Sequence, residues 1–592
     1  MSVMRRIQVG FLGGLLSVLP FMQACQDQEL ANQLEELSEE LEEAKQINNL
    51  LAFRQTILDA RVSEVLVSNV AEEPNGEWNL SFEDGSVYQV DSGIVAEVAL
   101  DSASWKVDFT LSDASEVSGH FIGNLSITEE QIELNPFNSA PLSALAQVST
   151  PVKGSFVVTV KGQDGDVSDI IYESPNVGTE HSLPIIGLYG EYDNTVELTF
   201  VSATGAVRAT HTTTVTTEAL PTGLPTVDIV VPLSNPAQNT LFLVNYRAVN
   251  MPFMMDAFGK VRWFSNGFTT VRKYGLQIFA NGNVGYGVAG AGQGSVMEYT
   301  LVGEFVREYT FYPAYENAHH DVFELPNGNL LVAVNETGGE TIEDQIIEMD
   351  RNSGAILTEW DLRESLPTDR LTFRVIQDGA DWFHNNAIWY DERDHSLILS
   401  GQAQGVVKVD WDNNLKWILA PHEGWPEEYQ DYLLQPTEAE GFEWVWGQHA
   451  PQVLPSGNLL LFDNGFGREF GAADQFSRAV EFEIVENDNG IGGSISEVWQ
   501  YGKERGEEFF APFISDVDYY PTTDTRFLVA GSTAFSLNYV DSANMTLTPD
   551  PTAIETIMVE VNEAKEVLFE ATFSSEGKTG TTYRAEKLIL FN

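Results

Sequence analysis

Cysteine is nearly missing from this chain of 592 residues, in which Cys25 is the only one. No disulfide can therefore form within the chain. A cysteine nucleophile and a thiolate-bound metal in the body of the protein are excluded as well, because both require cysteine thiolates. The chemistry of the chain must come from other side chains.

Basic residues are also scarce: 31 lysines and arginines stand against 88 aspartates and glutamates, so the net charge is −57. This balance excludes nucleic acid as a natural partner, because a phosphate backbone attracts basic surfaces. It favours a soluble, salt-tolerant surface. An anionic substrate would approach against this field, so donors within the site would have to bind it.

Near the start of the chain two arginines, Arg5 and Arg6, precede an apolar run, residues 7–22, that is too short to span a membrane with normal flanks. The next stretch, Met22-Gln23-Ala24-Cys25, resembles a lipobox. We therefore expect a lipoprotein signal peptide at residues 1–24, lipidation of Cys25, and membrane attachment through that lipid. The exported protein would then be periplasmic or on the cell surface. Ordinary secretion with an unmodified cysteine is the alternative.

Residues 25–62 are predicted to form a helical stalk. Leucines recur at three- and four-residue spacing among glutamates and glutamines, from Leu30 to Leu41. A short stalk or coiled coil fits this pattern, and a solvated amphipathic helix fits it almost as well. Formation of a homo-oligomer is left open.

Two β units are expected next. Residues 63–125 alternate apolar and polar residues in short runs, which indicates a small β module acting as a spacer, with carbohydrate binding as an alternative. Residues 126–225 carry longer alternating runs, such as 155–162, and indicate a β-sandwich.

The rest of the chain repeats one pattern. His449 and His320 each stand six residues before a proline that opens a tight turn, Pro455 and Pro326, and an apolar strand follows each turn. His384 begins a third copy with a longer turn. In a fourth copy Ser515 takes the place of the histidine.

The turns of this pattern fall near residues 236, 280, 326, 391, 455 and 521. Repeats of roughly 40–50 residues with about four strands each are typical of a β-propeller. We therefore predict an all-β fold in which residues 226–592 form a six-bladed propeller. Equivalent positions of successive blades surround one axis, so the three histidines and Ser515 should meet at one mouth of the central channel.

The motifs of this region resemble those of the bacterial arylsulfate sulfotransferase family, which acts without a nucleotide sulfate donor. The resemblance covers about residues 130–592 and rests on these segments: 318–321 with 325–329, 381–386, 448–450, 462–465, 477–480, 501–506 and 583–587. It implies a six-bladed propeller that moves a sulfuryl group from a phenolic sulfate ester to another phenol through a sulfated histidine. Neither a cofactor nor a metal is implied.

By the same resemblance His449 is the nucleophile, and His320 and His384 surround the sulfuryl group. Asn386 joins them, and Ser515 stands where the family has threonine or serine. One position departs from the family: Gln402 replaces an arginine. Glutamine donates hydrogen bonds but supplies no charge, so the fixed cation is missing at that position.

Other interpretations remain open on the residues alone. Three histidines also form a recognised catalytic metal set, which would make the chain a metal-dependent hydrolase or oxygenase. A binding propeller without catalysis is the third interpretation, and Gln402 favours it. Four arginines are candidates for the missing cation, although ion pairs would account for each: Arg468, Arg478, Arg505 and Arg584. His319, next to His320, is expected to point to the opposite face of its strand.

Overall fold

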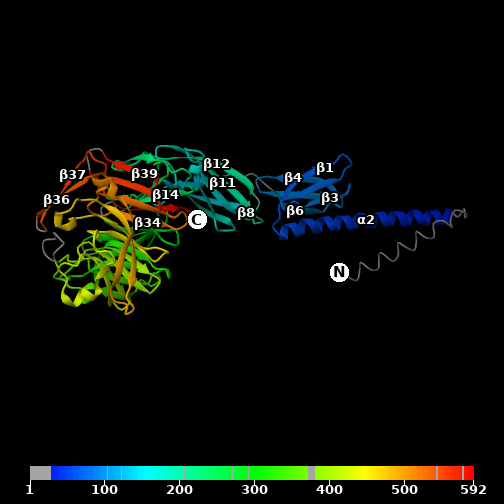
Figure 1. Cartoon of the computed structure of the whole chain (residues 1–592). Helices are drawn as coiled ribbons and strands as arrows, with labels where there is room; N and C mark the ends of the chain where they lie inside the picture. The colour runs from blue at the N-terminus through cyan, green and yellow to red at the C-terminus, as the bar shows by residue number, and fades with distance from the viewer. Residues whose placement is uncertain are drawn as a thin grey trace.

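The computed structural model describes residues 28–102, 104–121, 123, 125–203, 205, 207–267, 272–290, 293–370, 380–541, 544–575 and 579–591. The predicted signal peptide and Cys25 lie outside these residues and stay predictions. One long helix and a series of β domains follow each other along the chain (Figure 1). The all-β prediction is confirmed.

The amino-terminal unit is the long helix α2 (Gln28–Val62) packed against two small sheets. Phe53 and Ile57 are fully buried, and the Phe53 ring meets Phe109 edge-on at 5.1 Å. The remainder of the helix extends beyond the sheets (Figure 1). No helix in the described part of the chain combines the length and apolarity needed to cross a membrane. The sheets consist of β1 (Val67–Glu72), β2 (Trp78–Phe82), β3 (Val87–Val90), β4 (Val95–Asp101), β5 (Lys106–Leu111) and β6 (Glu116–His120).

The second unit is organised around β8 (Ser143–Val160), whose side chains alternate between buried and exposed positions along most of its length. Its first half pairs with β7 (Ile132–Leu134) and β10 (Gly178–Ile186), and its second half with β9 (Ile170–Glu173) and β11 (Asp193–Ser202). Strand β12 (Val207–Thr216) pairs with β11. Both groups of strands are therefore joined through β8, and their buried apolar side chains pack into one core.

Six sheets form the propeller, and each is a blade of four or five strands. The blades, written from the central strand outward, are: β40 (Thr582–Ile589), β14 (Thr240–Tyr246), β15 (Phe253–Asp256), β16 (Val261–Phe264); β17 (Arg272–Ile278), β18 (Val284–Gly290), β19 (Gln293–Tyr299), β20 (Phe305–Thr310); β21 (Tyr315–Glu324), β22 (Leu330–Glu336), β23 (Gln345–Met349), β24 (Ile356–Asp361); β25 (Asn385–Asp391), β26 (Ser396–Gly401), β27 (Gly405–Asp410), β28 (Leu415–Leu419); β30 (His449–Val453), β31 (Leu459–Asp463), β32 (Arg478–Glu486), β33 (Gly493–Tyr501), β29 (Leu434–Pro436); β34 (Asp516–Tyr520), β35 (Thr525–Ala530), β38 (Thr556–Asn562), β39 (Val567–Ser574), β13 (Thr226–Val231).

Short elements complete the described chain. A two-stranded hairpin, β36 (Phe535–Asp541) and β37 (Asn544–Pro549), stands beside the last blade. Six 3₁₀ helices lie in the described loops: η2 (Glu129–Gln131), η3 (Asp166–Ser168), η4 (Leu362–Glu364), η5 (Glu427–Tyr432), η6 (Arg468–Gly471) and η7 (Lys503–Phe509).

The two ends of the propeller segment close the ring. The last strand, β40, pairs with β14 and so becomes the central strand of the first blade, whereas β13 pairs with the outer strand β39 of the last blade. The repeat pattern predicted six blades, and the structure confirms this number. It did not predict that the first blade takes its central strand from the carboxyl terminus.

Arg262 joins the sandwich to the propeller. Its side chain is fully buried, and it donates hydrogen bonds to the backbone oxygens of Gly187 at 2.7 Å and Ser168 at 2.9 Å. The same guanidinium pairs with Asp256 at 3.0 Å and lies 3.9 Å from the centre of the Tyr189 ring. Burial raises the pKa of Asp256, and the Arg262 charge opposes that rise.

Replacing Arg262 by methionine should destabilise the protein by about 3–5 kcal/mol, because Asp256 would be left buried without its partner. Denaturant unfolding measures the change. Adding Asp256→Asn to the same chain should recover part of the loss, since the unpaired charge is then removed. Equal stability of the parent and Arg262→Met would show that this contact does not hold the two domains together.

Candidate active site

The candidate site lies at one end of the propeller channel, where the six central strands β17, β21, β25, β30, β34 and β40 contact each other in succession. Each is associated with one side chain of the site: Tyr274, His449 and Tyr583 lie in the first three residues of their strands, His384 and Ser515 directly precede theirs, and His320 lies in the middle of β21. The rings of His320 and His384 lie 4.6 Å apart, centre to centre. Tyr583 connects the rest, with its ring 6.0 Å from His320 and 6.3 Å from His449.

The backbone is unusual at these positions. His320, His384 and Ser515 have φ values of 55°, 57° and 99°, in the region that non-glycine residues rarely adopt. Ala450, which follows His449, has a φ of 52°. The strand register shifts at or beside three of these sites, between 318 and 322, 385 and 387, and 449 and 452. Such bulges re-aim side chains, and here the same device recurs in neighbouring blades.

The bulge also changes the environment of His319. In a regular strand its ring would face away from that of His320, but the positive φ of His320 breaks the alternation. The two Nδ1 atoms lie 3.2 Å apart, and His319 Nε2 lies 3.3 Å from the Val334 oxygen. The expectation that His319 points to the opposite face is therefore wrong.

His449 is held in one orientation by acceptors on one ring nitrogen. Its Nδ1 lies 2.7 Å from Asn464 Oδ1 and 3.0 Å from the Gly447 oxygen. Asn464 is itself fixed, because its Nδ2 donates to the backbone oxygens of Ala511 at 2.7 Å and Ile514 at 2.5 Å. Two acceptors at Nδ1 assign the proton to that atom, so Nε2 carries the lone pair. No described residue is hydrogen-bonded to Nε2.

Burial sets the charge of His449. The residue is 3% exposed, and burial lowers its pKa to about 3, with the hydrogen bond that His449 donates to Asn464 only partly opposing the effect. Burial also lowers the pKa of His320 well below the usual range. Both imidazoles are therefore neutral at physiological pH, which is the nucleophilic form of histidine.

His384 has a different environment. Its Nδ1 lies 3.0 Å from Asp381 Oδ2 and contacts the Glu343 carboxylate, which also lies 3.7 Å from His320 Nδ1. Burial would raise the pKa of Glu343, but the neighbouring His320 and His384 outweigh burial and hold that pKa well below its usual range. Two carboxylates at Nδ1 place a proton there and stabilise the ring when it becomes charged.

The structure places the three predicted substrate-binding residues around these histidines. Ser515 Oγ accepts a hydrogen bond from the Gly531 N–H at 3.1 Å, which leaves its own proton available. Asn386 Nδ2 donates to the Gln448 oxygen at 2.8 Å, so this amide also holds the backbone before His449. The Gln402 N–H donates to the His384 oxygen at 3.1 Å, and its side chain lies beside Gly447. The substrate-binding roles of Ser515, Asn386 and Gln402 stay predictions.

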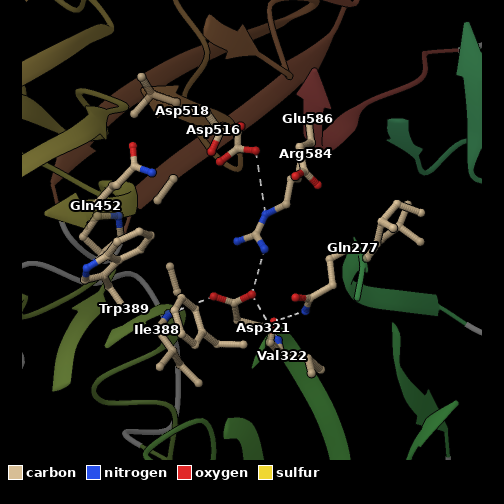
Figure 2. Close-up of a pocket in the computed structure, with 17 residues that line it drawn as sticks. Gln277, Asp321, Val322, Ile388, Trp389, Gln452, Asp516, Asp518, Arg584 and Glu586 are labelled. Carbon is tan, nitrogen blue, oxygen red and sulfur yellow. Dashed lines mark hydrogen bonds and ion pairs between the residues drawn. The ribbon is translucent and has the colours of Figure 1, made fainter. Parts of the chain in front are cut away.

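The four arginines considered as replacements for the missing cation are all ion-paired. Arg468 and Arg478 pair with Asp463, Arg505 with Glu570, and Arg584 with Asp321 at 2.8 Å. Figure 2 shows Arg584 reaching between Asp321 and Asp516 in a cavity of about 260 Å³. The lining of this cavity includes the residues that directly follow His320, His449, Ser515 and Tyr583, so it continues the channel beyond the candidate site.

A different cation, Arg247, lies beside the site. Its guanidinium carbon lies 5.6 Å from the centre of the Tyr274 ring and 5.7 Å from that of Tyr583, and these rings contact His320. Among the described residues no carboxylate lies within 4.0 Å of this guanidinium. Arg247 follows β14 directly, and its backbone N–H donates a hydrogen bond to the oxygen of Thr581, the residue before β40, at 2.9 Å.

Sequence reasoning missed several of these residues. Asp381 and Asn464 lie within the segments 381–386 and 462–465, which carried the family resemblance, so a signal existed for both. Glu343 lies in an acidic loop between β22 and β23, and Arg247 in a turn, and neither belongs to a repeated pattern.

The described residues also include two groups able to hold a metal ion. One is His319, His320 and Glu343, and the other is Glu343, Asp381 and His384, with ligand atoms within 4.8 Å of one another. His449 belongs to neither group. The three-histidine metal set considered from the sequence is therefore not formed in the described part of the chain.

The chain is similar to known proteins along most of its length. Residues 226–584 match the family model described as arylsulfotransferase, and residues 131–218 match its Ig-like domain. The arylsulfate sulfotransferase AssT of Escherichia coli O6:H1 is 26% identical over 67% of this chain and 84% of its own length. AssT of Lelliottia amnigena is 25% identical over 68% and 84%. A quinoprotein alcohol dehydrogenase-like structure from Bacteroides thetaiotaomicron covers 76% of this chain and 94% of its own, at 10% identity and a TM-score of 0.30.

His449 should remain neutral as the pH is lowered to about 4, because its folded-state pKa is about 3 against the ordinary value of 6.5. In the unfolded chain this ring has the ordinary pKa of 6.5, so the unfolded state binds the proton at a higher pH than the folded state does. The free energy of unfolding therefore falls as the pH drops from about 6.5 towards 3. Histidine-selective NMR titration measures the midpoint, and His449→Asn identifies the signal. A midpoint above pH 5 would contradict the assignment of a buried neutral ring.

Proposed function

This chain belongs to the arylsulfotransferase family, and from that premise we propose that it transfers a sulfuryl group between phenols through a covalent adduct on His449. The donor is a phenolic sulfate ester and the acceptor is a second phenol. The observation that carries the proposal is the neutral, buried His449 ring, whose Nδ1 is held by Asn464 while Nε2 is left without a hydrogen bond to any described residue.

In the first step the Nε2 lone pair of His449 attacks sulfur. The N–S bond forms, the bond from sulfur to the phenolic oxygen breaks, and the phenolate leaves with the electron pair. In the second step the acceptor phenol oxygen attacks sulfur, and the N–S electron pair returns to His449. Splitting one transfer into two displacements is the usual advantage of covalent catalysis.

His384 is the residue best placed to move the proton. With carboxylates of Glu343 and Asp381 at Nδ1, its ring is stabilised when Nε2 also carries a proton. It would protonate the leaving phenolate and then take the proton of the acceptor phenol. His320 and Ser515 would donate hydrogen bonds to the sulfonate oxygens, where negative charge increases in the transition state.

Arg247 supplies the positive charge that Gln402 lacks. It has no carboxylate partner within 4.0 Å among the described residues, and the Tyr274 and Tyr583 rings hold it over the mouth of the channel. Gln402 lies beside His384 and Gly447, in a different part of the ring of blades. In a chain of net charge −57 such a local cation offsets the repulsion of a sulfate ester.

A second candidate function follows from the cluster of His384, Glu343 and Asp381, whose ligand atoms could hold a metal ion. The reaction would then be a metal-assisted hydrolysis of the sulfate ester. Measuring metal content and activity after chelator treatment separates the two, since the covalent route requires no metal.

Brief incubation with a chromogenic phenyl sulfate, without acceptor, should add one sulfuryl group to the protein, and peptide mass spectrometry should locate it on His449. Replacing His449 by asparagine should remove the adduct and reduce turnover by about 10⁴-fold or more. His395→Asn is a matched control, because His395 lies in a turn and stacks on Trp411. Transfer at the normal rate by His449→Asn would disprove the covalent route.

Replacing Arg247 by glutamine should lower kcat/KM for an aryl sulfate by about 10²-fold, and mainly through KM, because a charge that attracts the anionic donor is lost. Arg247→Lys keeps the charge and should retain most of the affinity. Arg307→Gln is the control, since Arg307 lies on the outer strand β20. If Arg247→Gln has the parent KM and the same dependence on ionic strength, Arg247 does not bind the donor.

A further inference from the structure

Helix α2 carries two apolar faces, and only one of them packs against another part of the described chain. Leu50, Phe53, Ile57 and Ala60 pack against the small β module, where Phe53 and Ile57 are fully buried. A second row of residues runs along the helix at alternating spacings of three and four: Leu30, Leu34, Leu37, Leu41, Ala44, Asn48, Leu51, Gln55, Leu58 and Val62. This is the a and d pattern of a heptad repeat.

The second row is exposed. The side chains of Leu37, Leu41, Leu51, Leu58 and Val62 are between 39% and 84% exposed. A helix turns by about 100° per residue, so the two rows lie on nearly opposite sides of α2. A partner on the exposed row would therefore not meet the β module. Five leucines and valines left in water along one side of a helix indicate a missing partner.

From this face we propose that α2 binds the α2 of a second copy of this chain as a parallel, in-register, two-stranded coiled coil. The heptad row is self-complementary, because its a and d residues interdigitate with the same residues of an identical helix. The helix lies outside both family matches, which begin at residues 131 and 226.

Two polar features select the parallel arrangement. Asn48 occupies an a position, and an in-register parallel pair places it opposite its counterpart, where the two amides can hydrogen-bond. At the flanking g and e positions, Glu40 of one helix would face Lys45 of the other. Within one chain Lys45 contacts Glu42, so the second helix would add a carboxylate to an existing pair. A single Asn at an a position favours two strands.

The mass of the mature chain in solution tests the association. The chain carries Cys25→Ser, so that no lipid drives it together, and sedimentation equilibrium should give the mass of a dimer. Adding Leu37→Glu and Leu41→Glu should weaken the dimer by at least about 100-fold, since four leucines leave the interface and four carboxylates enter it. Both side chains are exposed in the single chain, so the fold should be unaffected.

A matched control introduces the same kind of substitution, an exposed apolar residue to glutamate, at a position outside the heptad row. Val87 is 65% exposed on the β module, away from the heptad row, and Val87→Glu should leave the dimer intact. A parent chain that is monomeric at all accessible concentrations would overturn the proposal. So would a dimer that persists in the Leu37→Glu, Leu41→Glu chain, because another surface would then be responsible.

A cysteine in the heptad row tests the orientation. Because Cys25→Ser removes the only cysteine, Leu37→Cys provides a single thiol per chain. Parallel helices in register bring the two positions within the 4.4–6.8 Å between Cα atoms that a disulfide requires. Mild oxidation should then produce a covalent dimer, whereas antiparallel helices that overlap fully would separate the positions by roughly 24 Å at 1.5 Å per residue. Absence of this crosslink in a dimeric chain would exclude the parallel register.

Discussion

The pairing of β40 with β14 is the contact on which the propeller and its site depend. It joins residues from the two ends of the propeller segment in one blade and closes the ring. The same strand carries Tyr583, which contacts His320 and His449, and Arg584, which pairs with Asp321 in the channel. A β-ring without this closure would leave two blade edges open and the central strands without a fixed separation. The site geometry is therefore a consequence of closure.

Within the closed ring, two chemically different histidine environments stand side by side. His449 is paired with an amide and a backbone oxygen and stays neutral, as a nucleophile must. His384 is paired with two carboxylates and can carry a charge. Environments that push the proton affinities of neighbouring groups apart separate nucleophile from acid and base in many enzymes. The same separation supports the division of roles proposed for this chain.

The sequence predicted the elements of this site that recur. The proline turns placed His320, His449 and Ser515 in one register, and the blade count followed from their spacing. Contacts that join distant segments had no such signal: the β40–β14 pair, the loop residue Glu343 and the cation Arg247 each depend on the closed ring. The expectation for His319 failed for a local reason, because strand periodicity does not foresee a positive φ at the next residue. Residue roles inferred from the family resemblance remain predictions.

Because β40 follows all the other blade strands in the sequence, the active site can form only late in synthesis. All three histidines precede it by more than a hundred residues, yet the ring that aligns them is complete only after the final strand docks. A nascent or prematurely terminated chain that stops before Thr582 would contain every proposed reacting group and still lack an assembled site. Activity would thus require synthesis through β40, because this strand closes the ring of blades.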